Sequence, residues 1–240
     1  MTIQAIHVDK VTAGFGPVNI LHEVDLQFPA GGRIAVIGRN GVGKTTLLKA
    51  IMGLADIHSG RIRLFGQDIT RLSARERAHA GIGYVPQTRD IFPSLTVEEN
   101  LVTGLKGRPR SDIAEAYDMF PRLAERRRNG GAQLSGGEQQ MLTVARTLLG
   151  KPRVLLLDEP LEGLAPIICH ELMRTFDTMA RATGVTVVLV EQKVDDALRF
   201  TTDAVVLERG EVVYRSDSGE LAQRQDLLER YVGVAGDAHA

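Results

Sequence analysis

The sequence contains a single cysteine, and this scarcity excludes one class of protein. Cys169 has no partner for an internal disulfide, so the chain does not resemble the disulfide-stabilised secreted domains. The chain also opens without the basic stretch and following apolar stretch of a secretory signal segment. Together these two features favour a cytosolic protein.

Long apolar runs and an excess of basic charge are missing as well. No uninterrupted apolar run approaches the ~18 residues of a membrane-spanning helix, so any role at a membrane should depend on a partner. Lysine and arginine total 29 against 30 aspartate and glutamate residues, whereas proteins that bind nucleic acid non-specifically are usually strongly basic. We therefore expect no nucleic-acid partner. The 240 residues, without internal repeats, suffice for one large domain.

Residues 38–46, GRNGVGKTT, match the motif G-x-x-x-x-G-K-[ST]. They follow Arg33–Ile37, which predicts a buried strand, and lead into Thr46–Met52, which has helical spacing. Glycines let successive N–H groups turn toward phosphate oxygens, and the helix start adds its positive dipole end. Lys44 would reach the β- and γ-phosphates, and the Thr45 hydroxyl would bind Mg²⁺. The predicted nucleotide contacts in this loop are Gly38, Asn40, Gly41, Gly43, Lys44, Thr45 and Thr46.

An aromatic residue, Phe15, lies upstream of this loop in a turn-like stretch. Ile3–Val8 and Val24–Phe28, on either side of it, predict strands with one buried face. The ring could make a small contact outside the main core, or it could stack on the adenine base of a nucleotide. The residues alone leave both alternatives open.

The middle of the chain changes from strand patterns to helical ones. Gly60–Phe65 and Gly81–Val85 predict strands, and helical signals begin after Gln87. Thr96 with a glutamate three residues later fits a capping box, and the apolar residues of Asp112–Arg127 recur near helical spacing. We predict one domain over residues 1–233, a helical subdomain inserted at about residues 88–133, and a loose tail over 234–240.

Two acids follow the apolar run Val154–Leu157, which predicts a buried parallel strand. Ligands bind at the carboxyl edge of such sheets, so Asp158 is expected beside Thr45 at Mg²⁺, and Glu159 is expected to polarise the attacking water. A helix-capping acid followed by proline is the common alternative, but the phosphate loop favours the catalytic interpretation. Further strands are predicted at Val185–Val190 and in an edge hairpin, Ala204–Leu207 with Val212–Tyr214.

Four motifs occur in a characteristic order: the phosphate loop, Tyr84–Gln87, Leu134–Glu138 and Leu157–Pro160. Over nearly the whole chain they resemble the ATP-binding subunit of an ABC transporter, and the Ser-Gly-Gly signature separates this family from other P-loop ATPases. The resemblance implies an α/β fold with a mostly parallel sheet, an N-terminal antiparallel β subdomain and an inserted helical subdomain.

The resemblance also implies roles for individual residues. Phe15 would stack on adenine, and Gln87 would contact Mg²⁺ and the attacking water. Ser135, Gly136 and Gly137 would contact the γ-phosphate held by a second subunit, since a hydroxyl and bare N–H groups at a helix start form an anion site.

The implied partners follow from this arrangement. They are a second ATP-binding subunit, either identical or a sister chain, two transmembrane permease subunits and, indirectly, an extracytoplasmic solute-binding protein. The chain would lie peripherally on the cytoplasmic face of the membrane and bind two ATP molecules per dimer.

Two positions depart from the commonest family pattern. Gln192 stands where many relatives have histidine, and its amide donates a hydrogen bond without charge or proton. Ala165 stands where the loop after Pro160 usually has aspartate. An inactive site is one explanation, but Lys44 and the two acids are intact.

Both departures resemble a particular branch of the family. Glu191-Gln192, Gly163–Pro166 and Glu138–Leu142 resemble the importers of branched-chain amino acids. Arg39–Val42, Val85–Gln87 and Glu162-Gly163 favour the related importers of urea and short amides. We rank the amino-acid branch first. A soluble ABC ATPase would need tandem cassettes or a long coiled-coil insert, and this chain has neither. A non-hydrolysing regulator would have lost its catalytic groups, whereas Glu159 is present here.

Overall fold

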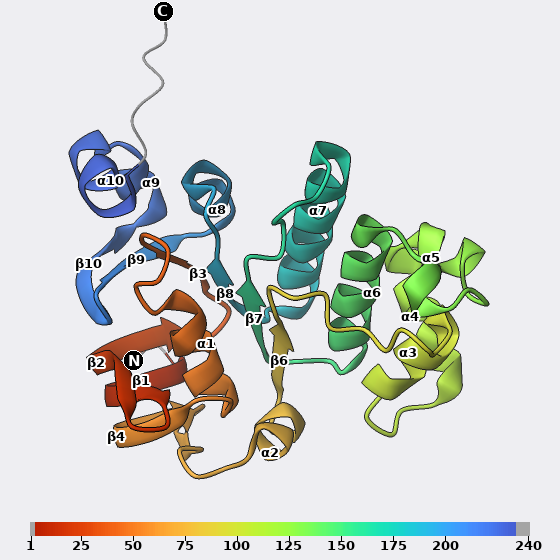
Figure 1. Ribbon diagram of the computed structural model, residues 1–240, viewed down its shortest axis with the longest axis horizontal. Coiled ribbons are helices and arrows are strands. Elements are labelled where there is room, and N and C mark those ends of the chain that lie inside the picture. The colour runs from red at the N-terminus through yellow and green to blue at the C-terminus, as the bar shows by residue number, and fades with distance from the viewer. Residues whose placement is uncertain (1–2, 234–240) are drawn as a thin grey trace, which may run out of the picture.

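The computed structural model describes residues 3–233 and contains two β-sheets with helices packed around them (Figure 1). The N-terminal sheet is antiparallel, with strand order β2-β1-β4-β5, and consists of β1 (Gln4–Phe15), β2 (Val18–Pro29), β4 (Asp56–Leu64) and β5 (Gln67–Asp68). The second sheet has the order β10-β9-β3-β8-β7-β6 and consists of β3 (Arg33–Ile37), β6 (Ile82–Val85), β7 (Val154–Asp158), β8 (Thr186–Val190), β9 (Asp203–Glu208) and β10 (Glu211–Asp217). Its strands are parallel except for the edge strand β10.

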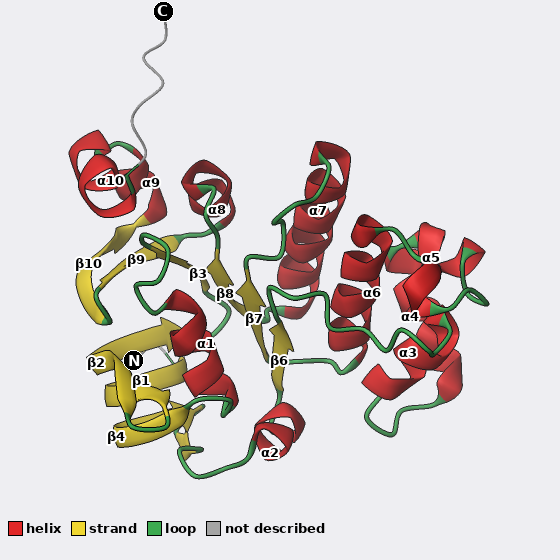
Figure 2. Ribbon diagram, in the orientation of Figure 1, coloured by secondary structure: helices red, strands yellow, loops and turns green. Residues whose placement is uncertain are grey.

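The helices lie mainly beside the second sheet (Figure 2). They are α1 (Lys44–Met52), α2 (Ala74–His79), α3 (Val97–Gly104), α4 (Ala114–Met119), α5 (Pro121–Glu125), α6 (Gly136–Leu149), α7 (Pro166–Thr183), α8 (Val194–Phe200), α9 (Ser218–Ala222) and α10 (Gln225–Val232), with 3₁₀ turns η1 (Arg110–Ile113) and η2 (Gly131–Gln133). In Figure 1, α3–α6 lie at the opposite end of the molecule from the N-terminal sheet. None of the helices in residues 3–233 combines the length and apolar character that a bilayer span requires.

The apolar run of β7 is continuous because both faces of this strand are buried. Leu155 and Leu157 pack into the core that contains α6 and α7, whereas Val154 and Leu156 pack into the core formed by α1 and the N-terminal sheet. All four side chains are fully buried. The predicted α/β fold, with a mostly parallel sheet and an antiparallel N-terminal sheet, is confirmed. The domain limits and the subdomain at about residues 88–133 stay predictions.

Strands β1 and β2 are much longer than the sequence predicted. Irregular pairing interrupts their alternation: Lys10 has φ +46° and Glu23 has φ +45°, and the register of β1 against β2 shifts between Val8 and Val11. A bulge adds a residue to one strand without ending it. The strands therefore continue to Phe15 and Val18, and the predicted strands correspond to only part of each.

The single helix expected over Asp112–Arg127 is wrong. Phe120 adopts φ −135° and ψ 84° between α4 and α5, because Pro121 disfavours helical backbone in the preceding residue and cannot donate an N–H. Ile113, Phe120 and Leu123 are still buried, which explains why the sequence pattern looked helical.

Helices α7, α9 and α10 were not anticipated, although Pro166 at the start of α7 and Gly184 after it are typical helix boundaries. Helix α10 ends at Val232 and is capped by Gly233, which has φ +76°. The predicted loose tail, residues 234–240, lies outside the described residues.

Candidate functional site

The loop between β3 and α1 curls because its glycines adopt backbone that other residues avoid. Gly38 has φ +151° and Gly43 has φ +110°. A Cβ on Gly38 would lie 2.3 Å from the carbonyl oxygen of Leu207, so this position also lacks room for a side chain. Helix α1 follows at once, and its first N–H groups face the loop.

Lys44 is the first residue of α1 and is only 5% exposed. Its ammonium donates to the carbonyl oxygens of Gly38 at 2.9 Å and Arg39 at 3.0 Å. Burial lowers the pKa of Lys44, while the nearby Glu159 and Asp158 carboxylates act in the opposite direction. The loop carbonyls thus hold the Lys44 ammonium in place, and Lys44 lines a cavity beside α1.

Asp158, the last residue of β7, is fully buried beside that cavity. It accepts hydrogen bonds from the hydroxyls of Thr45 and Tyr84, each at 2.9 Å. Burial raises the pKa of Asp158, whereas these two hydroxyls, Lys49 and Lys44 lower it. Burial and Asp158 also raise the pKa of Tyr84. The contact of Tyr84 with Asp158 could not be predicted from its motif, because it depends on the pairing of β6 with β7.

Glu159 adopts a left-handed backbone, with φ +48°, and is 6% exposed. Its Oε2 accepts from the side-chain amides of Gln87 at 2.9 Å and Gln192 at 2.8 Å. The three residues predicted to be catalytic therefore converge on one carboxylate oxygen, although they come from three different loops. They line a cavity of about 470 Å³ together with Asn40, Gly41, Gly43, Lys44, Thr45, Thr46, Ile20 and Glu162.

Gln87 has a second contact that the sequence did not indicate. Its amide nitrogen also donates to Glu162 at 2.7 Å, so Gln87 joins Glu159 to the loop before α7. No hydrogen bond joins its side chain to Asp158 or Thr45 among residues 3–233. Its predicted contact with Mg²⁺ stays a prediction.

The signature residues cap α6 rather than line this cavity. The Ser135 hydroxyl accepts from the N–H of Glu138 at 3.3 Å, and the Glu138 carboxylate accepts from the N–H of Ser135 at 2.8 Å. Ser135 is exposed, and Gly136 and Gly137 form the first turn. The predicted capping box at Thr96 and Glu99 is confirmed at α3.

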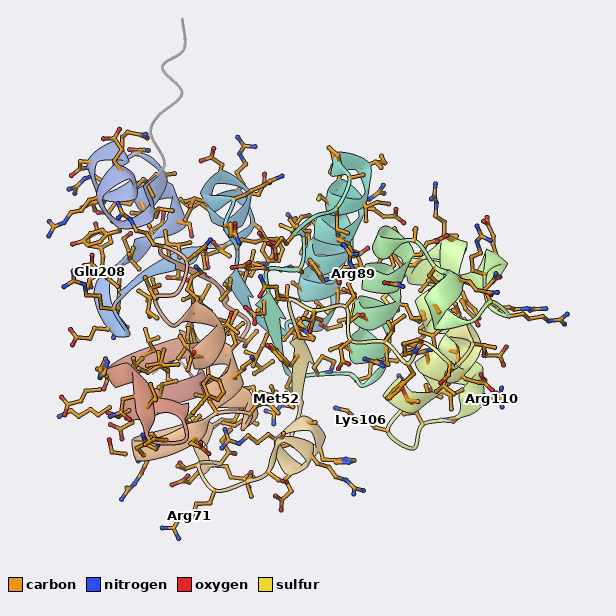
Figure 3. The ribbon with its side chains drawn as sticks, viewed as in Figure 1. Met52, Arg71, Arg89, Lys106, Arg110 and Glu208 are labelled. Atoms are coloured by element: carbon orange, nitrogen blue, oxygen red, sulfur yellow. The ribbon has the colours of Figure 1, made fainter. Side chains whose placement is uncertain are left out.

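Arg89 is a neighbour of the signature that sequence reasoning missed. A Cβ on Gly136 would lie 2.4 Å from its guanidinium, and Gly163 is also close. In Figure 3 the labelled side chain lies near α6 and α7. Arg89 therefore places an exposed positive charge at the start of the signature helix.

Phe15, at the end of β1, is 43% exposed and does not belong to either buried core. Its ring lies 5.7 Å from the ammonium of Lys49, on the helix that follows the phosphate loop. The alternative of a small core contact does not describe this exposed ring. Its stacking on adenine stays a prediction.

The two departures from the family pattern have clear structural positions. Gln192 follows β8 and contacts Glu159 directly. Ala165 stands at the N-cap of α7 and gives that helix no side-chain cap, although Pro166 at the first helical position suits a helix start. Only the first departure touches the cavity.

The model of the ABC transporter family matches residues 21–162, which contain the phosphate loop, the signature and both acids. The chain belongs to the ABC transporter family. As the ATP-binding subunit of such a transporter, it is an ATPase whose hydrolysis of ATP powers transport.

Two curated relatives of this ABC subunit match it over nearly their full length. The chain is 38% identical over 229 residues to the high-affinity branched-chain amino acid transport ATP-binding protein BraG of Pseudomonas aeruginosa, covering 94% of this chain and 98% of BraG. It is 39% identical over 233 residues to the probable branched-chain amino acid transport ATP-binding protein LivF of Archaeoglobus fulgidus, covering 94% and 97%.

A solved structure has the same fold as this ABC subunit. The ATP-binding cassette MJ0796, in a dimeric post-hydrolysis state with ADP and Pi, superposes with a TM-score of 0.80 at 26% identity. The match covers 89% of this chain and 98% of that one.

Proposed function

We propose that this subunit powers the import of branched-chain amino acids from the cytoplasmic face of a membrane. Both curated relatives carry that substrate in their names, and Gln192 and Ala165 support the same branch. Import of urea or short amides is the alternative, which the Arg39–Val42 pattern favours. The proposed assembly contains two ATP-binding subunits, two permease subunits and an external solute-binding protein.

The observation that carries the catalytic part of the proposal is the convergence of Gln87 and Gln192 on Glu159. Glu159 would accept a proton from the water that attacks the γ-phosphate. One hydrogen of the Gln192 amide already binds Glu159, and its second hydrogen would be directed to a γ-phosphate oxygen. Lys44 and the loop N–H groups would hold the β- and γ-phosphates, and Phe15 would support the adenine.

The residues beside Lys44 fit an Mg²⁺ ion. The Thr45 hydroxyl and the Asp158 carboxylate lie 2.9 Å apart and provide oxygen donors, which Mg²⁺ prefers. Gln87 is proposed as a third contact. The ion would neutralise charge on the β- and γ-phosphates, and Asp158 would keep the Thr45 hydroxyl oriented toward it.

A second subunit would complete each site. Ser135, Gly136 and Gly137 do not line the cavity of their own chain, yet they form a helix start suited to an anion. The dimeric state of MJ0796 with ADP and Pi supports such a pairing. The Ser135 hydroxyl accepts from the Glu138 N–H in its own chain and also contacts the Glu138 carboxylate, so it would turn its hydrogen from that carboxylate to a phosphate across the interface.

A groove of about 560 Å³ is the surface we assign to a permease subunit. Leu54 and Phe92 line it and are each 48% exposed, so an apolar helix end of the permease would bury them. Pro86 and Thr88, on either side of Gln87, also line it. A partner bound here would therefore be coupled mechanically to the Glu159 contact.

Uptake measurements test the substrate. In cells that lack this chain, we expect loss of labelled leucine uptake with urea uptake unchanged. Wild-type chain should restore leucine uptake, and Lys44→Ala should not, because it removes the cation of the phosphate loop. Loss of urea uptake alone would support the alternative branch and contradict this proposal.

A further inference from the structure

Glu191 is a buried carboxyl group that the proposed chemistry does not yet use. It follows β8 and is 4% exposed. Its Oε1 accepts from the backbone N–H of Leu161 at 3.0 Å, and its Oε2 accepts from the backbone N–H of Gln192 at 3.2 Å. Burying a carboxylate is costly unless its oxygens are hydrogen-bonded, so these two contacts indicate a specific requirement for this group.

The two N–H groups belong to segments that are far apart in the sequence. Leu161 begins the loop that leads from the acid pair to α7, and this loop also carries Glu162, which contacts Gln87. Gln192 carries the amide that binds Glu159. The Glu191 carboxylate therefore fixes the distance between the loop before α7 and the residue that holds Glu159.

We propose that Glu191 is a positioning residue for ATP hydrolysis, because it ties the backbone of Gln192 to that of Leu161 and thereby holds the Gln192 amide against Glu159. This inference rests on the roles proposed above for Glu159 and Gln192. A carboxylate suits this role because each of its two oxygens can accept a hydrogen bond from one of the two N–H groups. A carboxamide has one accepting oxygen, and its NH₂ would face one of the two N–H donors.

Protonation of Glu191 should weaken its hydrogen bonds to the N–H groups of Leu161 and Gln192. The pKa of Glu191 is raised to about 7: burial raises it most, the N–H groups of Leu161 and Gln192 lower it, and the Glu159 and Asp196 carboxylates raise it. Cys169 of α7 and Lys193, just before α8, are the other titratable neighbours. The protonated carboxyl loses part of its accepting capacity, so turnover should rise as pH increases through 7.

The test measures steady-state ATP hydrolysis by the full chain with Mg²⁺ and saturating ATP, from about pH 6 to about pH 8.5. Wild-type turnover should rise with a midpoint near pH 7. In Glu191→Gln, turnover at high pH should fall by about tenfold or more while the KM for ATP is unchanged, and the midpoint should disappear. Glu191→Asp should partly restore both the turnover at high pH and the midpoint near pH 7. Asp195→Asn removes an exposed carboxylate on α8 and should match wild type.

Two results would each overturn the inference. One is a Glu191→Gln chain that keeps the turnover and midpoint of wild type. The other is a wild-type profile that is flat through pH 7, and this result needs no variant and so stands even if Glu191→Gln fails to fold. A wild-type chain without ATP hydrolysis would instead contradict the proposed roles on which the inference rests.

Discussion

Gln87 and Gln192 orient Glu159 without neutralising it, because an amide donates a hydrogen bond but carries no charge. Glu159 also has a left-handed backbone, which costs a residue with a side chain of the order of 1–3 kcal/mol and persists where the surroundings determine it. Its N–H donates to the carbonyl oxygen of Val190 at 2.8 Å. Glu159 is therefore held in place by hydrogen bonds to both its backbone and its side-chain carboxylate.

Replacing Gln192 tests this arrangement. Gln192→Ala removes the donor to Glu159 and the proposed donor to the γ-phosphate, and a hydrogen bond to a charged group contributes roughly 1.5–3 kcal/mol. Turnover should fall about 10- to 200-fold, at ~1.4 kcal/mol per decade. Gln192→His should keep substantial activity because an imidazole N–H can reach the same oxygens. Steady-state rates are normalised to folded protein.

The alternative role for Gln192 is a helix cap for α8. In that case alanine would cost about 1 kcal/mol of stability and leave turnover nearly unchanged. The structure gives α8 no side-chain cap and places Lys193 at its N-cap, which disfavours this role. A Gln192→Ala enzyme within about twofold of wild type, measured against the ~1.4 kcal/mol per decade scale, would contradict the catalytic assignment.

Glu191 should also make folding stability depend on pH. Its folded-state pKa is raised to about 7, so the folded chain binds more protons than the unfolded chain between the ordinary glutamate pKa and 7. The free energy of unfolding should therefore decrease as pH rises through this window, by roughly 3 kcal/mol for a shift of this size.

Urea denaturation at several pH values checks this dependence. In Glu191→Gln, which cannot titrate, the decrease should be smaller by about that amount, while Asp195→Asn serves as the control. Identical pH dependence in wild type and Glu191→Gln would show that Glu191 is not protonated in the folded chain.

At the scale of elements, α3 and α6 begin with the same capping box but should respond differently to its loss. Thr96 caps α3 with Glu99, and Ser135 caps α6 with Glu138. Alanine at either position should cost about 1 kcal/mol of stability. Only Ser135→Ala should also weaken ATP-dependent pairing, because only this hydroxyl is proposed to contact a phosphate in the partner.

Thermal unfolding and ATP-dependent sedimentation of both variants measure these effects separately. Thr96→Ala is the matched control for lost helix stability. If the two variants paired equally well at the same fraction folded, the proposed phosphate contact of Ser135 would be wrong.

Local motifs made the phosphate loop, the acid pair and the α3 cap predictable, since each depends on residues close in sequence. The contacts around Glu159 were harder to predict, because Gln87 and Gln192 reach it only through the order of β6, β7 and β8 in the sheet. The irregular pairing of β1 was hidden for a different reason: positive φ at Lys10 disrupts the alternation that marks a strand. Periodicity likewise failed at Pro121, where buried apolar residues continue through a helix break.

At the scale of the whole molecule, the phosphate loop and the signature serve different sites. The cavity beside Lys44 is lined by the loop, Glu159, Gln87 and Gln192 but not by Ser135–Gly137. If the signature acts on ATP as proposed, it therefore acts on ATP held by another subunit, and two chains must pair for hydrolysis. A permease bound in the proposed groove beside Gln87 would then couple this pairing to transport.

Sedimentation of the full-length Glu159→Gln chain, with and without ATP and Mg²⁺, tests this central claim most directly. The amide cannot accept a proton as the carboxylate does, so hydrolysis should slow by ~10²–10⁴-fold and ATP should remain bound between two subunits. We predict a monomer without nucleotide and a stable dimer with ATP, and the same variant with Lys44→Ala should stay monomeric. A Glu159→Gln chain that remains monomeric with ATP and hydrolyses it at the wild-type rate would contradict the account.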